Sequence, residues 1–185
     1  EHMDYYRDLA HIKETFQEFT NTLTSEGVVY VNADDENALQ LQTNGTRITF
    51  GIGKGNVAGF PEEFVDGSRK VLIEQNGSMI GVLELCIPGF HNVRNALATV
   101  ACGLQNGISF DAIADALKNF SGIWRRFEKV GMYKTSPVYS DYGHHPTEIN
   151  ATLQGARELY PHRRLVLLFQ PHQYDRTKKL FNDFY

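Results

Sequence analysis

Residues 138–179 read VYSDYGHHPTEINATLQGARELYPHRRLVLLFQPHQYDRTKK. Val138 to Asp141 is typical of a strand, and a helix is expected to start at His145-Pro146, because proline is tolerated in the first helical turn, where its missing N–H has no intrahelical acceptor. The apolar run Leu165 to Phe169 is typical of a strand buried on both faces of a parallel sheet. Strand, helix, strand and a further helix in succession predict an α/β fold with right-handed crossovers.

Polar residues follow both predicted strands and indicate a ligand site. Ligands of open parallel sheets bind just beyond the carboxyl ends of the strands, and those ends carry residues 141–145 and 170–176. Asp141 suits an acceptor for ribose hydroxyls, and His145 suits a substrate contact. A metal site of Asp141 with His144 and His145 is disfavoured, because neighbouring histidines on a strand-to-helix turn point apart and no H-E-x-x-H spacing is present.

Upstream of about residue 130 the sequence predicts a mixture of helices and short strands. A helical stripe of period near 3.6 runs through residues 5–23. Strands are expected at residues 28–31, 47–50, 71–73 and 79–86. The last two strands are joined by Asn76-Gly77, a pair that favours tight hairpin turns. A helix is expected over residues 92–105, and Ser109 or Asp111 would cap another.

The start of the helix at residue 92 offers amide and imidazole groups. His91, Asn92 and Asn95 lie at and just inside it. Asn95 can present both a donor and an acceptor to the edge of an adenine. Capping of the helix by Asn92, with solvent-facing polar neighbours, explains the same residues without a ligand.

Two adjacent arginines, Arg125 and Arg126, precede Glu128. A guanidinium group matches phosphate oxygens two at a time, so a phosphate clamp is one interpretation and a surface ion pair is the other. The glycine-rich stretch from Gly51 to Asn56 does not fit G-x-x-x-x-G-K-[ST], and strands are expected on both sides of it. No other stretch of the 185 residues fits that pattern.

Composition narrows the class of protein. The net charge is −4 and no basic run stands out, so the sequence gives no indication of a nucleic-acid partner. Cys86 and Cys102 fit no metal or redox spacing. No apolar stretch reaches the ~20 residues of a membrane span, and no secretory signal is visible. The chain begins at Glu1 within a helical pattern and stops at Tyr185 within another, so a piece of a longer protein is expected.

Five segments in series resemble blocks of the Mur ligase family, and within it the members that add L-alanine. The segments are EHMDYYRDLAHIKETFQEF, GFHNVRNALATVACGL, FSGIWRRFEKVG, SDYGHHPTEINATLQGAR and LVLLFQPHQYDRTKKLFNDF. The resemblance implies an α/β fold in which residues 1–129 are the second half of a central ATPase domain, without its phosphate-binding loop. Residues 130–185 would then be the first half of a Rossmann-like C-terminal domain that binds the amino acid.

The implied activity is an ATP-dependent amide bond between UDP-N-acetylmuramate and L-alanine, formed through an acyl phosphate in cytoplasmic cell-wall synthesis. ATP and Mg²⁺ are the implied cofactors. His2 resembles the magnesium ligand, Asn95 with His91 and Asn92 the adenine contacts, and Asp141 the ribose contact. Arg126 resembles the phosphate-binding arginine, and Arg126 and His145 are expected to be catalytic. The residues implied to contact the amino acid and the muramyl carboxylate are Tyr142, His144, His145, His172 and Arg176.

The chain departs from the family pattern at four positions. The family usually has alanine at Gly143, an acidic residue at Ser140 and arginine at Gln173. Gln17 stands where some members carry a carbamylated lysine, so that modification is not expected.

Two alternatives stay open. One is the recycling ligase that attaches a tripeptide to the same sugar, although Phe127 and the run from Phe169 to Arg176 favour the alanine-adding enzyme. The other is a module that binds nucleotide without catalysis.

Overall fold

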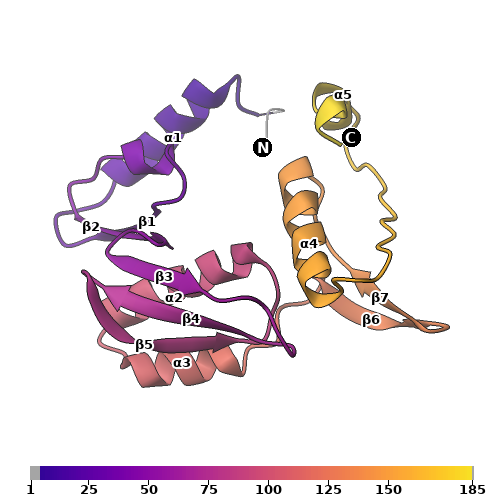
Figure 1. Cartoon of the computed structure of the whole chain (residues 1–185). Coiled ribbons are helices and arrows are strands. Elements are labelled where there is room, and N and C mark those ends of the chain that lie inside the picture. Colours follow the sequence, from indigo (N-terminus) through magenta and orange to yellow (C-terminus); the bar gives the residue numbers. More distant parts are fainter. Residues whose placement is uncertain (1–4, 185) are drawn as a thin grey trace.

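The computed structural model describes residues 5–184 as a mixed α/β protein. A five-stranded sheet occupies the first part of the chain, and its strands follow one another in chain order (Figure 1). Its strands are β1 (Val28–Asn32), β2 (Thr46–Ile52), β3 (Val57–Pro61), β4 (Arg69–Gln75) and β5 (Ser78–Leu85). β1, β2 and β3 are parallel, whereas β3, β4 and β5 are antiparallel. Strand pairing in this sheet therefore changes from parallel to antiparallel at β3.

Local turn signals in this sheet are confirmed. Asn76 and Gly77 join β4 to β5 with φ angles of 50° and 80°, as a two-residue hairpin turn requires. The glycine-rich stretch after Gly51 connects β2 to β3, and Gly53 and Gly55 have φ angles of 67° and 96°. Strands therefore lie on both sides of this stretch, as the sequence predicts.

Two helices, α2 (Phe90–Gln105) and α3 (Phe110–Lys118), cover one face of the sheet (Figure 1). α2 buries one side of its surface against β1, β2 and β3, and α3 packs on β5. The core residues are Val57, Val71, Ile73, Leu83, Leu85, Val93, Ala96, Leu97, Val100, Ala101 and Ile113. A Cβ atom on Gly59 would lie 2.7 Å from Leu97 Cδ2, so the close approach of α2 to β3 depends on glycine there. This packing fixes the amino end of α2 beside the sheet.

The first helix, α1 (Leu9–Asn21), is shorter than the predicted span of 5–23 and is capped by Asp8. The Gln17 side chain of α1 accepts a hydrogen bond from Gln42 N at 2.9 Å and donates one to Gln42 O at 3.0 Å. These two bonds hold α1 against the segment after η1 (Ala38–Gln40). The apolar stripe of α1 is largely exposed, and 66% of the surface of Phe19 is accessible to solvent. α1 therefore contributes little to the core.

The second part of the chain contains an antiparallel hairpin and a helix. β6 (Glu128–Tyr133) pairs with β7 (Ser136–Ser140), and α4 (Pro146–Leu159) follows. The predicted helix start at Pro146 is confirmed, and Ser109 is confirmed as the cap of α3. A short helix, α5 (Tyr174–Lys179), and η2 (Phe181–Phe184) complete the described residues.

The predicted strand at Leu165 to Phe169 is wrong for this structure. The segment pairs with no strand among residues 5–184, and Leu168 is 97% exposed. The apolar run indicates burial, but burial as a strand needs neighbours on both edges and both faces. Here β7 pairs with β6 in the antiparallel sense, so the expected parallel pair does not form in the described residues.

Candidate functional site

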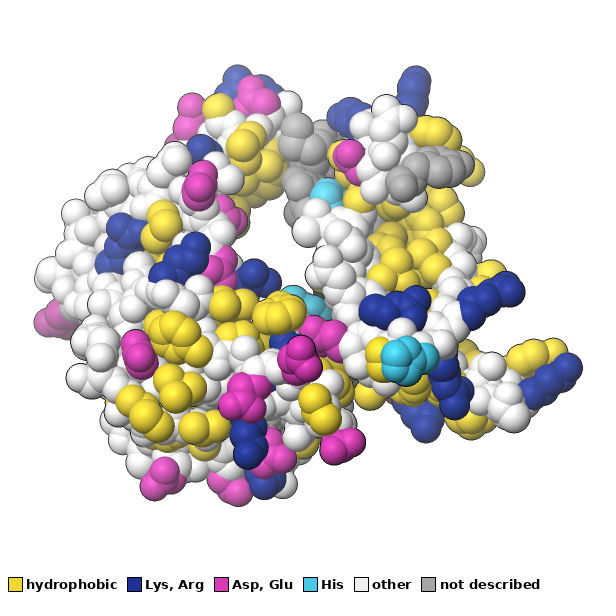
Figure 2. Space-filling view, in the orientation of Figure 1, with side chains coloured by type: hydrophobic (Ala, Val, Ile, Leu, Met, Phe, Trp, Pro, Cys, Tyr) yellow, Lys and Arg dark blue, Asp and Glu magenta, His cyan; other side chains and the backbone are white. Residues whose placement is uncertain are grey.

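A cleft of about 1020 Å³ lies between the amino end of α2, the loop before β6, and α4. Figure 2 shows the surface hollowed between the sheet and α4, with histidine and basic side chains at the floor of the hollow. The polar residues that line the cleft include His91, Asn92, Asn95, Thr99, Arg126, Asp141, Thr147 and Glu148. Apolar lining comes from residues such as Leu117, Phe120, Ile123, Trp124, Phe127 and Leu159. An apolar cleft with a few convergent polar groups is typical of a small-molecule site.

The amino end of α2 presents amide groups to this cleft. Helix α2 begins at Phe90 after Gly89, whose φ angle is 96° and which has no side-chain cap. The Asn92 amide instead donates to Pro88 O at 2.7 Å, so the predicted cap by Asn92 is wrong. One turn later, Asn95 is exposed, and its side-chain amide has no hydrogen-bond partner within residues 5–184. Asn95 can therefore offer both a donor and an acceptor to a ligand.

His91 is a half-buried residue in the first turn of α2. Its Nδ1 atom is buried without a hydrogen-bond partner in residues 5–184. Burial lowers the pKa of His91, and although the charges of Asp141 and Glu158 act in the opposite direction, they do not outweigh it. His91 lines the cleft, but its buried Nδ1 could reach a ligand only if the ring moved.

The loop before β6 is tied to the end of β7 by Asp141. Its two carboxylate oxygens accept from Phe127 N at 2.8 Å and from Gly143 N at 2.7 Å. Arg125 and Phe127 have φ angles of 57° and 49°, a left-handed conformation that is unfavourable for side chains of their size. These two residues flank Arg126, so Asp141 holds the loop in the shape that brings Arg126 to the cleft.

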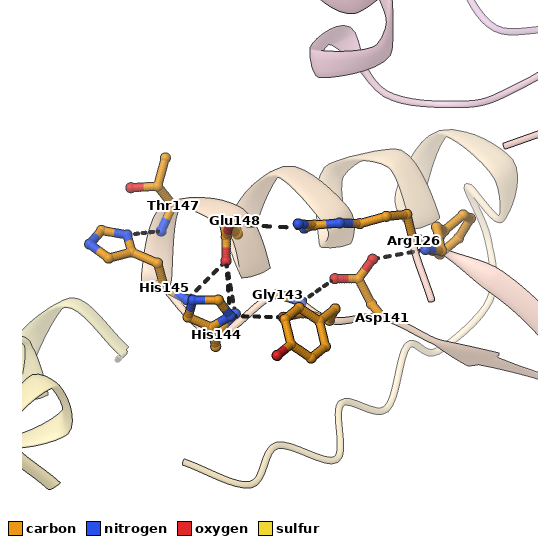
Figure 3. A network of polar contacts seen from close by, with 9 residues as sticks. Arg126, Asp141, Gly143, His144, His145, Thr147 and Glu148 are labelled. Atoms are coloured by element: carbon orange, nitrogen blue, oxygen red, sulfur yellow. Dashed lines mark hydrogen bonds and ion pairs between the residues drawn. The ribbon is translucent and has the colours of Figure 1, made fainter. Parts of the chain in front are cut away.

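Glu148 gathers the polar groups on the α4 side of the cleft (Figure 3). It accepts from His144 N at 2.9 Å and His145 N at 3.3 Å, and lies 3.9 Å from Arg126 Nη1. Burial opposes ionisation of Glu148, but the backbone donors of His144 and His145 and the charges of His144 and Arg126 lower its pKa overall. The half-exposed ion pair with Arg126 is long, and such pairs are weak. Arg126 can therefore exchange this contact for an anionic ligand.

The residues predicted for the second substrate lie beyond the cleft. His145 caps α4, with its Nδ1 accepting from Thr147 N at 3.3 Å, and His144 Nδ1 lies 3.0 Å from Tyr142 O. Tyr142, His144 and His145 do not line the cleft.

His172 is exposed and Arg176 half-buried, and neither lines the cleft. Both follow the unpaired segment after α4, which carries α5 to a place beyond the amino end of α4 (Figure 1). The structure thus brings together the five residues predicted to contact a nucleotide, and it does not bring His172 and Arg176 to them.

The predicted metal ligand, His2, lies outside the described residues. Within residues 5–184 no group of three or more His, Cys, Asp or Glu side chains is placed to hold a metal ion.

Glu148 was missed by sequence reasoning although a signal was present. It stands three residues after the helix cap at His145, the spacing of a capping box, but the cap is a histidine rather than serine or threonine. One interpretation of the sequence makes Glu128 a surface ion-pair partner of the arginine side chains. It accepts instead from Arg125 N at 2.9 Å, and so supports the loop backbone.

Two models of known protein families match most of the chain. Residues 1–103 match the family described as the Mur ligase middle domain, which is more than half of the chain. The chain belongs to the Mur ligase family. Residues 125–185 of this Mur ligase chain also match the family described as "Mur ligase, glutamate ligase domain". The cleft is lined by residues from both matched parts.

Individual relatives agree with this assignment. The UDP-N-acetylmuramate–L-alanine ligase of Aquifex aeolicus is 41% identical over 187 residues, a match that covers all of this chain and 41% of the relative. The crystal structure of UDP-N-acetylmuramate–alanine ligase from Thermotoga maritima gives a TM-score of 0.78 at 31% identity over 97% of this chain and 41% of that one.

A murein peptide ligase from Psychrobacter arcticus gives a TM-score of 0.63 at 27% identity, over 91% of this chain and 36% of that one. This Mur ligase chain therefore spans about two fifths of the length of the relatives it matches.

Proposed function

We propose that this chain is the nucleotide-holding part of a longer ligase that joins L-alanine to UDP-N-acetylmuramate and converts ATP to ADP and phosphate. The observation that carries the proposal is the single cleft that collects His91, Asn92, Asn95, Arg126 and Asp141. Three of these come from the start of α2 and two from segments more than 30 residues later in the chain. The similarity to alanine ligases over the whole chain supports the choice of substrates.

Each cleft residue suits one part of ATP. Asn95, which is exposed in the cleft, suits the polar edge of adenine, and His91 lines the cleft beside it. Each carboxylate oxygen of Asp141 accepts one backbone N–H and keeps a lone pair for a ribose hydroxyl. Arg126, held by the loop at the mouth of the cleft, suits the phosphate oxygens.

The proposed reaction is the one that the similarity to alanine ligases implies. An oxygen of the lactyl carboxylate of UDP-N-acetylmuramate attacks the γ-phosphorus of ATP, and ADP leaves. The amine of L-alanine then attacks the acyl carbon of the acyl phosphate, phosphate leaves, and the nitrogen loses a proton. Arg126 neutralises charge on the transferring phosphoryl group, which is the main requirement of such a step.

Mg²⁺ would supply further neutralisation of the phosphate charge. Its proposed ligand, His2, precedes the described residues, so the assignment of Mg²⁺ depends on family membership. Residues 1–129 are proposed as the second half of the ATPase domain and 130–185 as the first half of a Rossmann-like domain.

The proposed amino-acid contacts are Tyr142, His144, His145, His172 and Arg176, with His145 in a catalytic position. For His172 and Arg176 to act there, α5 must approach the cleft in the substrate-bound enzyme. Such closure would also exclude water from the acyl phosphate.

A cytoplasmic location is part of the proposal, because the substrates are precursors of the cell wall. Among residues 5–184, no helix combines the length and apolar character that crossing a bilayer requires.

The test is substrate-dependent phosphate release by the whole enzyme that contains this chain. With ATP, Mg²⁺ and UDP-N-acetylmuramate, L-alanine is expected to support release and the tripeptide is not. Release with the tripeptide alone would assign the recycling ligase instead. Nucleotide binding without release under either condition would leave only a binding module.

A further inference from the structure

Helix α4 is joined to the start of α2 by one carboxylate. Glu158 Oε1 lies 2.7 Å from Arg69 Nη2, and Glu158 Oε2 accepts from Gly89 N at 2.7 Å. Arg69 is the first residue of β4, and Gly89 immediately precedes α2. A single side chain therefore connects three segments that are far apart in the sequence.

This contact is buried on the Arg69 side and partly exposed on the Glu158 side. Arg69 is 3% exposed and Glu158 19% exposed, and the Arg69 guanidinium lies 4.3 Å from the centre of the Phe90 ring. Arg69 Nε and Nη1 are buried without hydrogen-bond partners within residues 5–184. A buried ion pair with unsatisfied donors adds little net stability, because the desolvation of both charges offsets their attraction. Its geometric effect, a fixed position for α4, is the stronger reason for its presence.

The location of Glu158 in its own helix supports this interpretation. Glu158 lies in the last turn of α4, where a carboxylate is unfavourable because the carbonyl end of a helix is partially negative. The same carboxylate lies at the partially positive amino end of α2, where it is favourable. Its charge therefore suits the contact between helices and not the helix that carries it.

The contact also brings the two backbones close together. A Cβ atom on Gly155, one turn before Glu158, would lie 3.5 Å from Gly89 Cα. A Cβ at that distance would be in ordinary van der Waals contact with Gly89, so α4 and the segment before α2 are packed directly against each other. Gly155 and Glu158 therefore both face Gly89 from α4.

The cleft lies along the length of α4. Glu148, which borders the cleft beside Arg126, stands ten residues before Glu158 in the same helix, or about 15 Å at the rise of an α-helix. Gly89 lies two residues before His91 and six before Asn95. A shift of α4 at Glu158 would therefore change the spacing between the two walls of the cleft.

We propose that Glu158, held by Arg69, is a positioning residue that sets the width of the nucleotide cleft without touching the nucleotide. This inference depends on the proposed function, because it assumes that the cleft holds ATP. The contact fixes α4, and α4 places Glu148 and Arg126 opposite His91 and Asn95.

The experiment measures ADP binding by calorimetric titration in the whole enzyme, for wild type and the variants Glu158→Gln, Glu158→Asp and Arg69→Met, and the double variant Glu158→Gln/Arg69→Met. Glu158→Gln places an amide N–H group or a weaker acceptor against Arg69, and Glu158→Asp is one methylene too short to reach both partners. We expect Glu158→Gln to weaken ADP binding on the order of tenfold and Glu158→Asp to weaken it less. The double variant should be no weaker than the worse single variant, because contacting partners are not additive.

The matched control is Glu84→Gln, which removes the carboxylate of an exposed ion pair with Lys118. It should bind ADP as the wild type does. Melting temperatures of all variants are measured alongside, because a purely structural role would lower the melting temperature without changing the affinity of the folded protein.

The outcomes are separable. If the wild-type enzyme does not bind ADP, the proposed function itself is wrong. Wild type that binds, together with Glu158→Gln and Glu158→Asp within twofold of it, would overturn the positioning role and leave the function intact. Strictly additive effects of Glu158→Gln and Arg69→Met would overturn it as well. If Glu158→Gln does not fold, Glu158→Asp and Arg69→Met decide the question.

Discussion

Replacement of Asp141 by asparagine tests the loop that presents Arg126. In the structure Asp141 accepts two backbone N–H groups, at 2.8 Å and 2.7 Å. Asparagine keeps one acceptor oxygen and turns an NH₂ group toward one of these donors, so one charge-assisted hydrogen bond of about 1.5–3 kcal/mol is lost. The left-handed residues Arg125 and Phe127 can then relax, which recovers part of their strain of about 1–2 kcal/mol each. The net loss of stability should be about 1–2 kcal/mol.

The effect on nucleotide binding should be larger. The Asp141→Asn variant also loses a charged acceptor for the ribose, again about 1.5–3 kcal/mol, which corresponds to a dissociation constant raised by roughly 10–100-fold. Urea unfolding gives the stability, and titration of the whole enzyme with ADP gives the affinity. Asp115→Asn, on the exposed face of α3, is the control and should leave affinity unchanged. A destabilised Asp141→Asn variant with wild-type affinity would refute the ribose contact and leave Asp141 as a loop support only.

Three further predictions address other parts of the site. Arg176→Ala in the whole enzyme should raise the KM for L-alanine by about 10-fold or more, because an arginine–carboxylate contact is lost. The effect on the KM for ATP should be much smaller. Equal effects on both KM values in steady-state kinetics would contradict the role assigned to Arg176. The pKa of Glu148 lies below its ordinary value, so its contribution to stability should be full above about pH 5 and should be lost as the pH falls through the folded-state pKa. Unfolding of wild type and Glu148→Gln as a function of pH measures this, and a stability difference that does not shrink as the pH falls would contradict it. The isolated 185-residue chain should release no phosphate in an L-alanine-dependent assay, because its sequence contains no phosphate-binding loop; measurable release would disprove this.

Local signals predicted several helix and turn boundaries, but no strand was expected at β3 or β6. The Asn76-Gly77 hairpin, the cap of α3 at Ser109 and the start of α4 at Pro146 are each determined within a few residues, and the structure confirms them. The predicted strand at Leu165 to Phe169 is wrong because an apolar run indicates burial but does not supply the partners that would bury it. The cap by Asn92 is wrong because α2 begins two residues earlier than predicted, at Phe90, which places Asn92 inside the first turn.

Contacts between distant segments could not be predicted. Asn95 and Asp141 were assigned one by one, and only the structure shows that they line one cleft. Glu158 gave no signal in the sequence, because its partners lie 69 and 89 residues away and depend on how α4 packs. Sequence patterns report the preference of each segment, whereas the site depends on how the segments are arranged.

The most direct test of a nucleotide cleft at the start of α2 is a crystal structure of the whole enzyme with a non-hydrolysable ATP analogue. The proposal predicts adenine within hydrogen-bond distance of Asn95 or His91, ribose hydroxyls on Asp141, and phosphate oxygens facing Arg126. An analogue bound at another surface, with this cleft empty, would contradict it.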